Sequence, residues 1–298
     1  MRVIELEAPA KLNLHLGIHS ELDDRGYHRA DSLMVALDLC DKVIVQETCC
    51  DGAPKNEASP HVDCIPPVGI PEERNTAYKA AVELAKRVGR VPCVRITIHK
   101  HVPDQAGMGG SSSDAAAVLR ALCELWGVDP LDPVVAEAAR MVGADVPFFL
   151  DPVPTLLVGA GDVVSKKFKS FAQPIPVALV RPKGPGVSTP AAYRAFDERP
   201  SAPASPNALC AALQDNNVCA SDIAEHLFNN LDPVACRLLP KVAEVRAWLA
   251  VREGVLGVQV TGSGSCVFAV CATSEDANRI VDEARADLGA WACAAHIA

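Results

Sequence analysis

A glycine- and serine-rich loop occupies residues 103–113, between two segments of different periodicity. Apolar and polar residues alternate over residues 94–98, which predicts a β-strand. From Ala115 apolar residues recur at helical spacing until Gly127, a residue type that commonly ends a helix. Glycines let a backbone approach a phosphate closely, and the first N–H groups of a helix donate to it at the positive end of the helix dipole. The sequence therefore predicts a strand, a phosphate-binding loop and a helix in succession.

Three consecutive serines close this loop. Ser111, Ser112 and Ser113 offer hydroxyl groups to phosphate oxygens or to magnesium, and we expect one of them to cap the helix. A tight turn with an N-cap explains part of the same pattern, but a cap needs only one serine. The loop is not a Walker A motif, because no lysine follows Gly110, and its glycines lack the G-x-G-x-x-G spacing of the Rossmann fingerprint. Protein-kinase signatures are absent from the sequence as well.

Lys100 precedes the loop, in strand phase with the apolar residues Val94, Ile96 and Ile98. A lysine on the buried side of a strand, with no obvious partner in the sequence, is a candidate ligand for a phosphate or a ribose. The alternative interpretation is a lysine whose ammonium group extends from the strand end to the surface.

The rest of the chain alternates between strand and helix patterns, which predicts an α+β fold with antiparallel strands in each half. Asn13 and His15 alternate with leucines, which predicts a half-buried strand at 12–18. Further strands are expected at 33–39, 43–45, 155–158 and 177–180, and helices at 75–87 and 133–141. A strand, a tight turn at 261–265, a strand, a helix and a strand end the sequence. Residues 49–72 are polar and Pro-rich, which predicts a surface excursion, and 200–206 a flexible connection. A polar, Pro-containing segment at 166–176 predicts the domain boundary, which gives domains 1–170 and 171–298.

The composition excludes several classes of function. A net charge of −9 argues against a nucleic-acid surface, which needs clustered lysine and arginine. No segment has the length and apolarity of a membrane span, and no signal peptide is evident, so we expect a cytoplasmic protein that does not bind membranes. The 12 cysteines are scattered without a C-x-x-C pair, so we expect small buried thiols rather than a disulfide framework or a zinc site.

Five segments together carry a resemblance to a known family. They are residues 9–14 (PAKLNL), 26–28 (GYH), 103–113 (PDQAGMGGSSS), 143–148 (GADVPF) and 262–266 (GSGSC). In this order the chain resembles the GHMP kinase superfamily over nearly its whole length. The GYH and GADVP segments narrow the resemblance to the 4-diphosphocytidyl-2-C-methyl-D-erythritol kinases, which belong to the non-mevalonate route to isoprenoids.

The resemblance implies a two-domain fold, with an N-terminal domain like ribosomal protein S5, a C-terminal ferredoxin-like α/β sandwich and the active site in the interdomain cleft. It implies ATP and Mg²⁺ as co-substrates and the 2-hydroxyl of the cytidylated methylerythritol as acceptor. By position, Asp145 is the expected catalytic base and Lys11 its charged partner. A carboxylate that accepts the hydroxyl proton raises the nucleophilicity of the alcohol, and a nearby ammonium keeps that carboxylate ionised. Without the resemblance, Asp145 is predicted to be a helix cap and Lys11 a solvated residue.

The expected binding residues combine the resemblance with the observations on the glycine-rich loop and on Lys100. For ATP they are Asn75, Lys100, Pro103, Asp104, Gln105, Ala106, Gly107, Met108, Gly109, Gly110, Ser111, Ser112 and Ser113, with Ser112 or Ser113 also on the metal. For the cytidylated substrate they are Asn13, Tyr27, His28, Thr189 and Tyr193. The expected binding partners are this small-molecule substrate and ATP. The protein is expected to be a monomer or a homodimer.

The sequence also departs from the family pattern. Ser111 stands where the family usually has a third glycine, and Arg25 and Arg29 flank GYH where acidic residues are common. Three rival hypotheses are a homoserine- or mevalonate-type GHMP kinase, a GHMP-fold ligand sensor without catalysis, and a general α+β interaction module. Retention of Lys11, Asp145 and the loop disfavours the sensor, and the clustering of polar groups at turns disfavours the module.

Overall fold

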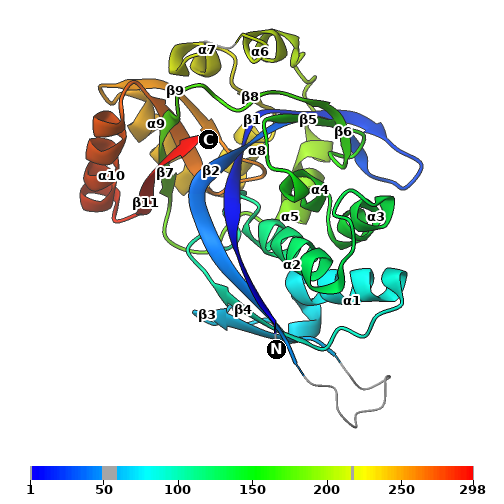
Figure 1. The fold of residues 1–298 in the computed structure, drawn as a ribbon. Coiled ribbons are helices and arrows are strands. Elements are labelled where there is room, and N and C mark those ends of the chain that lie inside the picture. The colour runs from blue at the N-terminus through cyan, green and yellow to red at the C-terminus, as the bar shows by residue number, and fades with distance from the viewer. Residues whose placement is uncertain (1, 49–58, 216–217, 298) are drawn as a thin grey trace. The chain divides into compact units, whose positions relative to one another are not determined.

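The computed structural model describes residues 2–48, 59–215 and 218–297 (Figure 1). The chain divides into two compact units. Unit 1 comprises Met1–Ala10, Leu39–Pro103 and Gly109–Pro152, and unit 2 comprises Lys11–Asp38, Asp104–Met108 and Val153–Ala298. Both units are discontinuous in sequence, so they do not coincide with a contiguous division at residue 170.

Two long strands contribute residues to both units. They are β1 (Val3–Leu22) and β2 (His28–Glu47). The sequence predicted two separate strands at 33–39 and 43–45, which is wrong, because β2 runs through both without a glycine or proline to stop it. The half-buried prediction for 12–18 is also wrong: Asn13 and His15 are each 1% exposed, so both faces of this part of β1 are covered.

Unit 1 places helices beside a small sheet. In the sheet, β4 (Val94–His99) pairs antiparallel with β2 and parallel with β3 (His61–Ile65). The strand β3 lies inside the predicted surface excursion at 49–72, and the 3₁₀ turn η1 (Glu72–Arg74) begins at its last residue. Part of the excursion, 49–58, lies outside the described residues. The helices are α1 (Thr76–Val88), α2 (Gly110–Trp126), α3 (Pro133–Val142) and α4 (Val146–Leu150), and α1 packs against α2 and α3. Alanines fill much of the α1–α2 contact, which lets the helices approach closely.

Unit 2 is built on an antiparallel sheet whose central strand is β7 (Ile175–Arg181), buried except at Arg181. It pairs with β10 (Val267–Cys271) and β11 (Trp291–Ile297); β9 (Val255–Val260) then pairs with β10, and β11 with β2. The helices α9 (Pro240–Ala250) and α10 (Ser274–Leu288) pack on this sheet, with Val180, Leu249 and Ile280 in the shared core.

Shorter elements complete unit 2. The strands are β5 (Thr155–Val158), which pairs with β2 and with β6 (Val163–Lys167), and β8 (Phe228–Asn229), which runs parallel to β1. The helices are α5 (Thr189–Glu198), α6 (Asn207–Ala212), α7 (Ala220–Glu225) and α8 (Asp232–Leu238). The predicted C-terminal order of strand, turn, strand, helix and strand is confirmed by β9, β10, α10 and β11.

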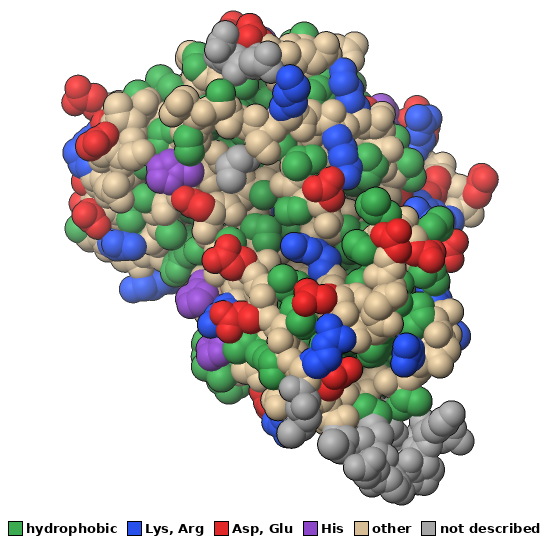
Figure 2. Space-filling view, in the orientation of Figure 1, with side chains coloured by type: hydrophobic (Ala, Val, Ile, Leu, Met, Phe, Trp, Pro, Cys, Tyr) green, Lys and Arg blue, Asp and Glu red, His purple; other side chains and the backbone are tan. Residues whose placement is uncertain are grey.

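The structure bears out only part of what the composition predicted for the cysteines. Acidic and basic side chains are interspersed on the face that Figure 2 shows. Four cysteines are buried as predicted, and burial raises the pKa of the Cys266 thiol to about 12. The prediction is wrong at Cys219, which is exposed, and at Cys93, which is disulfide-bonded. Within the described residues, no helix is long and apolar enough to cross a membrane.

Candidate active site

Residues 104–108 of the glycine-rich loop belong to unit 2, where they meet two segments that are distant in sequence. The backbone N–H of Lys11 donates to the carbonyl oxygen of Met108 at 2.9 Å. The hydroxyl of Thr261 donates to the carbonyl oxygen of Gly107 at 3.2 Å. Three of the five segments singled out in the sequence, at 9–14, 103–113 and 262–266, therefore adjoin one another at these bonds.

Glycine is required where this loop approaches the turn at 261–265. Gly107 has φ +77°, and a Cβ built on it would lie 2.2 Å from the carbonyl oxygen of Thr261. On the other side of the loop, a Cβ on Gly186 would lie 2.1 Å from the carbonyl oxygen of Gln105. The backbone is thus confined between two neighbouring segments, which fixes the course of residues 105–107.

The remainder of the loop begins α2 in unit 1. Gly109, in a left-handed conformation, is the N-cap, and its carbonyl oxygen accepts from the backbone N–H groups of Ser112 and Ser113 at 3.0 and 2.9 Å. The prediction that a serine caps this helix is therefore wrong, because all three serines lie inside its first turn. Ser113 is buried, Ser112 is half-buried and Ser111 is exposed.

Asn75, predicted to bind ATP, is the N-cap of α1. Its side-chain oxygen accepts from the backbone N–H of Ala77 at 2.9 Å, and its amide nitrogen lies 3.5 Å from the sulfur of Cys64. The hydroxyl of the next residue, Thr76, donates to the carbonyl oxygen of Ser111 at 2.6 Å, so the starts of α1 and α2 are adjacent. The role of Asn75 in ATP binding stays a prediction.

Lys11 belongs to a buried polar chain in unit 2. Its ammonium group donates to the side-chain oxygen of Asn13, and the amide nitrogen of Asn13 donates to the hydroxyl of Ser32 at 2.9 Å. All three side chains are at most 3% exposed. The backbone N–H of Asn13 also donates to the hydroxyl oxygen of Thr261 at 3.3 Å. The prediction that Lys11 and Asn13 share a strand face is confirmed, whereas a solvated Lys11 is wrong.

Asp145 lies in unit 1, immediately before α4. It occupies the N-cap position but makes no capping hydrogen bond with its side chain, so the prediction of an ordinary cap is wrong in that respect. Gly143 brings this segment to the start of α2, since a Cβ on Gly143 would lie 3.9 Å from the hydroxyl oxygen of Ser112. The GADVP segment and the serines are therefore neighbours within unit 1.

The aromatic residues predicted to bind the substrate gather in unit 2. The rings of His28 and Tyr193 lie 5.5 Å apart at an interplanar angle of 36°. Nε2 of His28 lies 2.9 Å from a carboxylate oxygen of Asp197, one turn further along α5. Tyr27 is 61% exposed, which is unusual for a large aromatic side chain, and leaves its ring accessible.

Thr189 begins the same helix, α5, that carries Tyr193. Its hydroxyl oxygen lies 3.0 Å from that of Ser263 in the turn at 261–265. The turn itself is held by Asn229, whose amide nitrogen donates to the carbonyl oxygens of Val260 and Gly262 at 2.8 Å each. Thr189 is thereby connected to the same turn that contacts the glycine-rich loop.

Lys100 has partners that the sequence did not reveal. Its ammonium group pairs with Asp41 and with Asp114, 2.7 Å from a carboxylate oxygen of the latter. The side chain is 8% exposed, so the alternative of a lysine extending to the surface is wrong. Direct binding of ATP by Lys100 stays a prediction.

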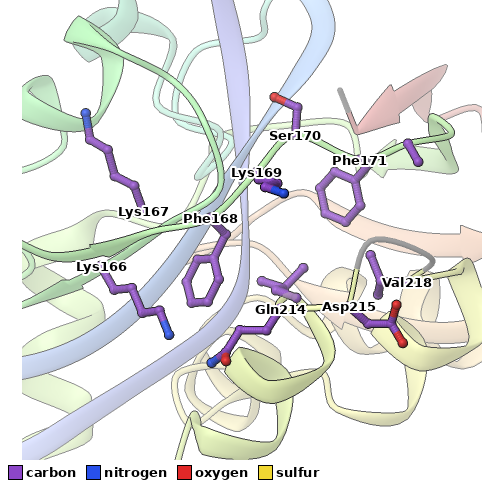
Figure 3. A pocket seen from close by; sticks show the side chains of 11 residues that line it. Lys166, Lys167, Phe168, Lys169, Ser170, Phe171, Gln214, Asp215 and Val218 are labelled. Atoms are coloured by element: carbon purple, nitrogen blue, oxygen red, sulfur yellow. The ribbon is translucent and has the colours of Figure 1, made fainter.

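A surface pocket of about 440 Å³ lies elsewhere in unit 2 (Figure 3). Residues 166–172 and Leu213, Gln214, Asp215 and Val218 line it, and the ammonium of Lys166 lies 5.0 Å from the ring centre of Phe168. None of the predicted site residues belongs to this pocket. It is therefore separate from the candidate active site.

Comparisons with known proteins place this chain among the GHMP kinases, the family that the five sequence segments resemble. Residues 75–151 match the GHMP kinases N terminal domain, and residues 211–290 match the GHMP kinases C terminal domain. A 4-diphosphocytidyl-2-C-methyl-D-erythritol kinase of Shouchella clausii is 34% identical over 281 residues, which cover 94% of this chain and 90% of the relative. The chain belongs to the GHMP kinase family. A relative of the same name from Pelotomaculum thermopropionicum is 35% identical over 93% of this chain and 92% of its own.

Solved structures of GHMP kinases have the same fold. A crystal structure of 4-(cytidine 5'-diphospho)-2C-methyl-D-erythritol kinase aligns with a TM-score of 0.77 at 31% identity, covering 98% of each chain. A homoserine kinase of Cytophaga hutchinsonii aligns with a TM-score of 0.67 at 18% identity, covering 99% of this chain and 94% of the other. The second likeness concerns the fold alone. The predicted two-domain α+β GHMP kinase fold is confirmed.

Three polar residues of the candidate site were missed in the sequence. Ser32 supports Asn13, Asp41 pairs with Lys100 from β2, and Asp114 does so from α2. Asp114 directly follows the three serines, and a carboxylate among the alanines of a buried helix face was a signal for it. Ser32 and Asp41 lie next to other polar residues of β2, Asp31 and Lys42, so no local pattern distinguishes them.

Proposed function

We propose that this chain transfers the γ-phosphoryl group of ATP to the 2-hydroxyl of 4-diphosphocytidyl-2-C-methyl-D-erythritol, a step in isoprenoid precursor synthesis. The observation that carries the proposal is the 34% identity to a kinase of that name over 94% of the chain. The likeness to homoserine and mevalonate kinases lies at 15–18% identity and supports only the common fold.

Asp145 is the proposed general base. Phosphoryl transfer needs mainly positioning and charge neutralisation, and a carboxylate that accepts the hydroxyl proton aids attack on phosphorus. Asp145 suits the role because its segment, through Gly143, adjoins the start of α2. It lies beside the glycine-rich segment, where phosphate is expected.

Lys11 is proposed to supply positive charge. Its ammonium is buried and held by Asn13, which in turn is held by Ser32, so its position is fixed before substrate binds. A preorganised charge in a site of low dielectric stabilises developing negative charge without reorganisation. The Lys11–Asn13–Ser32 chain therefore favours an electrostatic role over a solvated one.

The residues at the start of α2 fit a magnesium ion held mainly by ATP. Among the described residues, no cluster of three or more His, Cys, Asp or Glu side chains is arranged to hold a metal. The hydroxyl of Ser113 is enclosed and has no hydrogen-bond partner among these residues, whereas Ser112 is half-buried. Of the two predicted ligands, we therefore favour Ser112. Magnesium would supply neutralisation of phosphate charge.

Recognition of the cytidine ring is assigned to Tyr27, His28 and Tyr193. The exposed ring of Tyr27 offers a face for stacking, and His28 and Tyr193 already lie ring to ring. Aromatic faces bind nucleobases through stacking, and polar ring edges add hydrogen bonds. Thr189 and Asn13 remain proposed contacts to the rest of the substrate.

The test is ATP consumption by the purified protein with magnesium, with cytidylated methylerythritol, mevalonate and homoserine offered in parallel. We expect turnover with the cytidylated alcohol alone. Turnover only with another alcohol would keep the kinase and replace the substrate, and no turnover with any of the three would favour the non-catalytic sensor. A cytoplasmic location and a monomeric or homodimeric state stay predictions.

The role of Asp145 is tested in the same assay. Asp145→Asn is expected to lower kcat by about 10²- to 10⁴-fold, because the amide cannot accept the proton. Glu137→Gln, an exposed carboxylate-to-amide change on α3, is the control and should match the unaltered protein. Near-normal turnover of Asp145→Asn would remove the general base from the mechanism.

A further inference from the structure

Asp41, Lys100 and Asp114 form a buried ion cluster in unit 1. They come from three separate elements: β2, the residue after β4, and α2. The side chains are 0%, 8% and 5% exposed, respectively. Nζ of Lys100 pairs with both carboxylates, at 2.7 Å from Oδ2 of Asp114. All three side chains of the cluster are therefore largely removed from water.

The cluster contacts the chain on both sides of the glycine-rich loop. Before the loop, Oδ1 of Asp41 accepts from the backbone N–H groups of His101 and, at 2.8 Å, Val102. After the loop, Asp114 belongs to the first turns of α2. Lys100 binds both carboxylates, so one ammonium group links the segment that enters the loop to the helix that leaves it.

The ammonium also lies directly behind the first turn of α2. A Cβ built on Gly110 would lie 3.5 Å from Nζ of Lys100 and 3.1 Å from the side chain of Val102. A side chain at 110 would crowd Val102, so the first turn of α2 packs closely against Val102 and the ammonium group of Lys100. Movement of the ammonium group would displace the backbone where phosphate is expected to bind.

The charges of the cluster favour a fixed arrangement. Burial alone lowers the pKa of Lys100, but the two carboxylates outweigh it and raise that pKa above its ordinary value, so the lysine stays charged. A buried ammonium group is stable only while it is paired, which holds Lys100 to its two partners.

We propose that Asp41, Lys100 and Asp114 are positioning residues that brace the glycine-rich loop for ATP, and that Lys100 acts through this brace rather than as a phosphate ligand. The proposal rests on the proposed function for the identity of the ligand. It assigns a role to two acidic residues, Asp41 and Asp114, beside a site for a polyanion, where carboxylates would otherwise oppose binding.

The two roles for Lys100 predict opposite effects of Asp114→Asn. If Lys100 were a phosphate ligand, removal of a competing carboxylate would strengthen ATP binding or leave it unchanged. If the cluster is a brace, the same change loosens the loop, and we expect KM for ATP to rise by about tenfold, which corresponds to about 1.4 kcal/mol. KM for the alcohol should stay near its original value, and Asp41→Asn should behave like Asp114→Asn.

A second readout does not depend on activity. Hydrogen exchange of the backbone amides at 101–103 and 109–113 should accelerate in Asp114→Asn and in Asp41→Asn, with the amides of α1 unchanged. Leu84→Ala, which removes a fully buried side chain from α1, is the control for general destabilisation and should accelerate exchange in α1 first.

The outcomes separate this proposal from the proposed function. Absence of turnover in the unaltered protein would reject the function, while the exchange measurement would still test the brace. An active protein whose two aspartate variants keep the original KM for ATP and the original loop exchange would reject the brace. Tighter ATP binding by Asp114→Asn would reject it as well, and would restore Lys100 as a phosphate ligand.

Discussion

The buried imidazole of His15 makes the stability of this protein depend on pH. His15 is 1% exposed, its Nε2 atom has no hydrogen-bond partner among the described residues, and its ring stacks on Phe228 with 5.2 Å between ring centres. Burial lowers the pKa of His15 from 6.5 to about 4, and the nearby charge of Asp31 opposes the shift. The folded chain therefore holds His15 neutral under conditions where the unfolded chain would protonate it.

The sign of the effect follows from proton binding. Between pH 6.5 and pH 4 the unfolded chain binds a proton at His15 that the folded chain does not, so the free energy of unfolding falls as the pH falls. One unit of pKa shift corresponds to about 1.4 kcal/mol. The contribution of His15 lost between pH 7 and pH 5 is then about 2 kcal/mol, a large part of the net stability of a typical domain.

The measurement is urea unfolding of the unaltered protein and of His15→Phe at pH 7 and pH 5. Phenylalanine retains a ring to stack on Phe228 and cannot be protonated, so its loss of stability over this range should be smaller by about 2 kcal/mol. Equal losses in the two proteins would refute the reasoning. An NMR titration of the His15 ring with a midpoint near 6.5 would refute it independently.

Three further substitutions test other parts of the site. Ser32→Ala leaves Asn13 without its hydroxyl partner, and we expect kcat to fall by about tenfold with KM for ATP little changed, measured by steady-state kinetics. Gly107→Ala places a Cβ 2.2 Å from the carbonyl oxygen of Thr261, and we expect ATP binding, measured by calorimetry, to weaken by at least about tenfold. Tyr27→Ala should raise KM for the cytidylated alcohol by about tenfold without lowering the melting temperature, because the ring is exposed.

Each of these expectations has a contrary result. Unchanged kcat in Ser32→Ala would show that Asn13 and Lys11 are positioned without the hydroxyl of Ser32. Gly161→Ala is the control for Gly107→Ala, because Gly161 has φ +81° and nothing within 4 Å of a Cβ, so it carries the backbone strain without the clash. Equal weakening in both variants would deny a special role to the contact with Thr261. An unaltered KM in Tyr27→Ala would remove that ring from substrate binding.

The elements with strong local signals were predictable from sequence. The helices α1 and α3 have the predicted extents to within a residue, since Asn75 and Asp132 cap their starts and glycines end them. The strand β3 was missed because it is short and defined by parallel pairing with β4, and β8 because it consists of two residues beside β1. Such strands depend on distant partners rather than on their own periodicity.

The same distinction applies to the site. The glycine-rich loop and the turn at 261–265 were recognisable because glycines and serines of this spacing have few other uses. The partners of Lys100 were not, because Asp41 and Asp114 lie 59 and 14 residues away from it and meet it only in the folded chain. The serine cap was wrongly predicted because the N-cap is Gly109, which has a positive φ and precedes the first of the three serines by two residues.

The discontinuous units constrain how this chain is made. Its path passes from one unit to the other at residues 10, 38, 103, 108 and 152, so no single cut of the gene separates the two units: a cut after residue 152 keeps unit 1 whole but removes residues 11–38 and 104–108 from unit 2. During synthesis unit 1 is incomplete until residue 152 has emerged, and unit 2 is incomplete until the last strand has, since Ile297 pairs with Leu37. Folding that must close so long a loop is slow. The emerging chain is therefore expected to leave Leu37 of β2 without its partner strand until β11 has emerged.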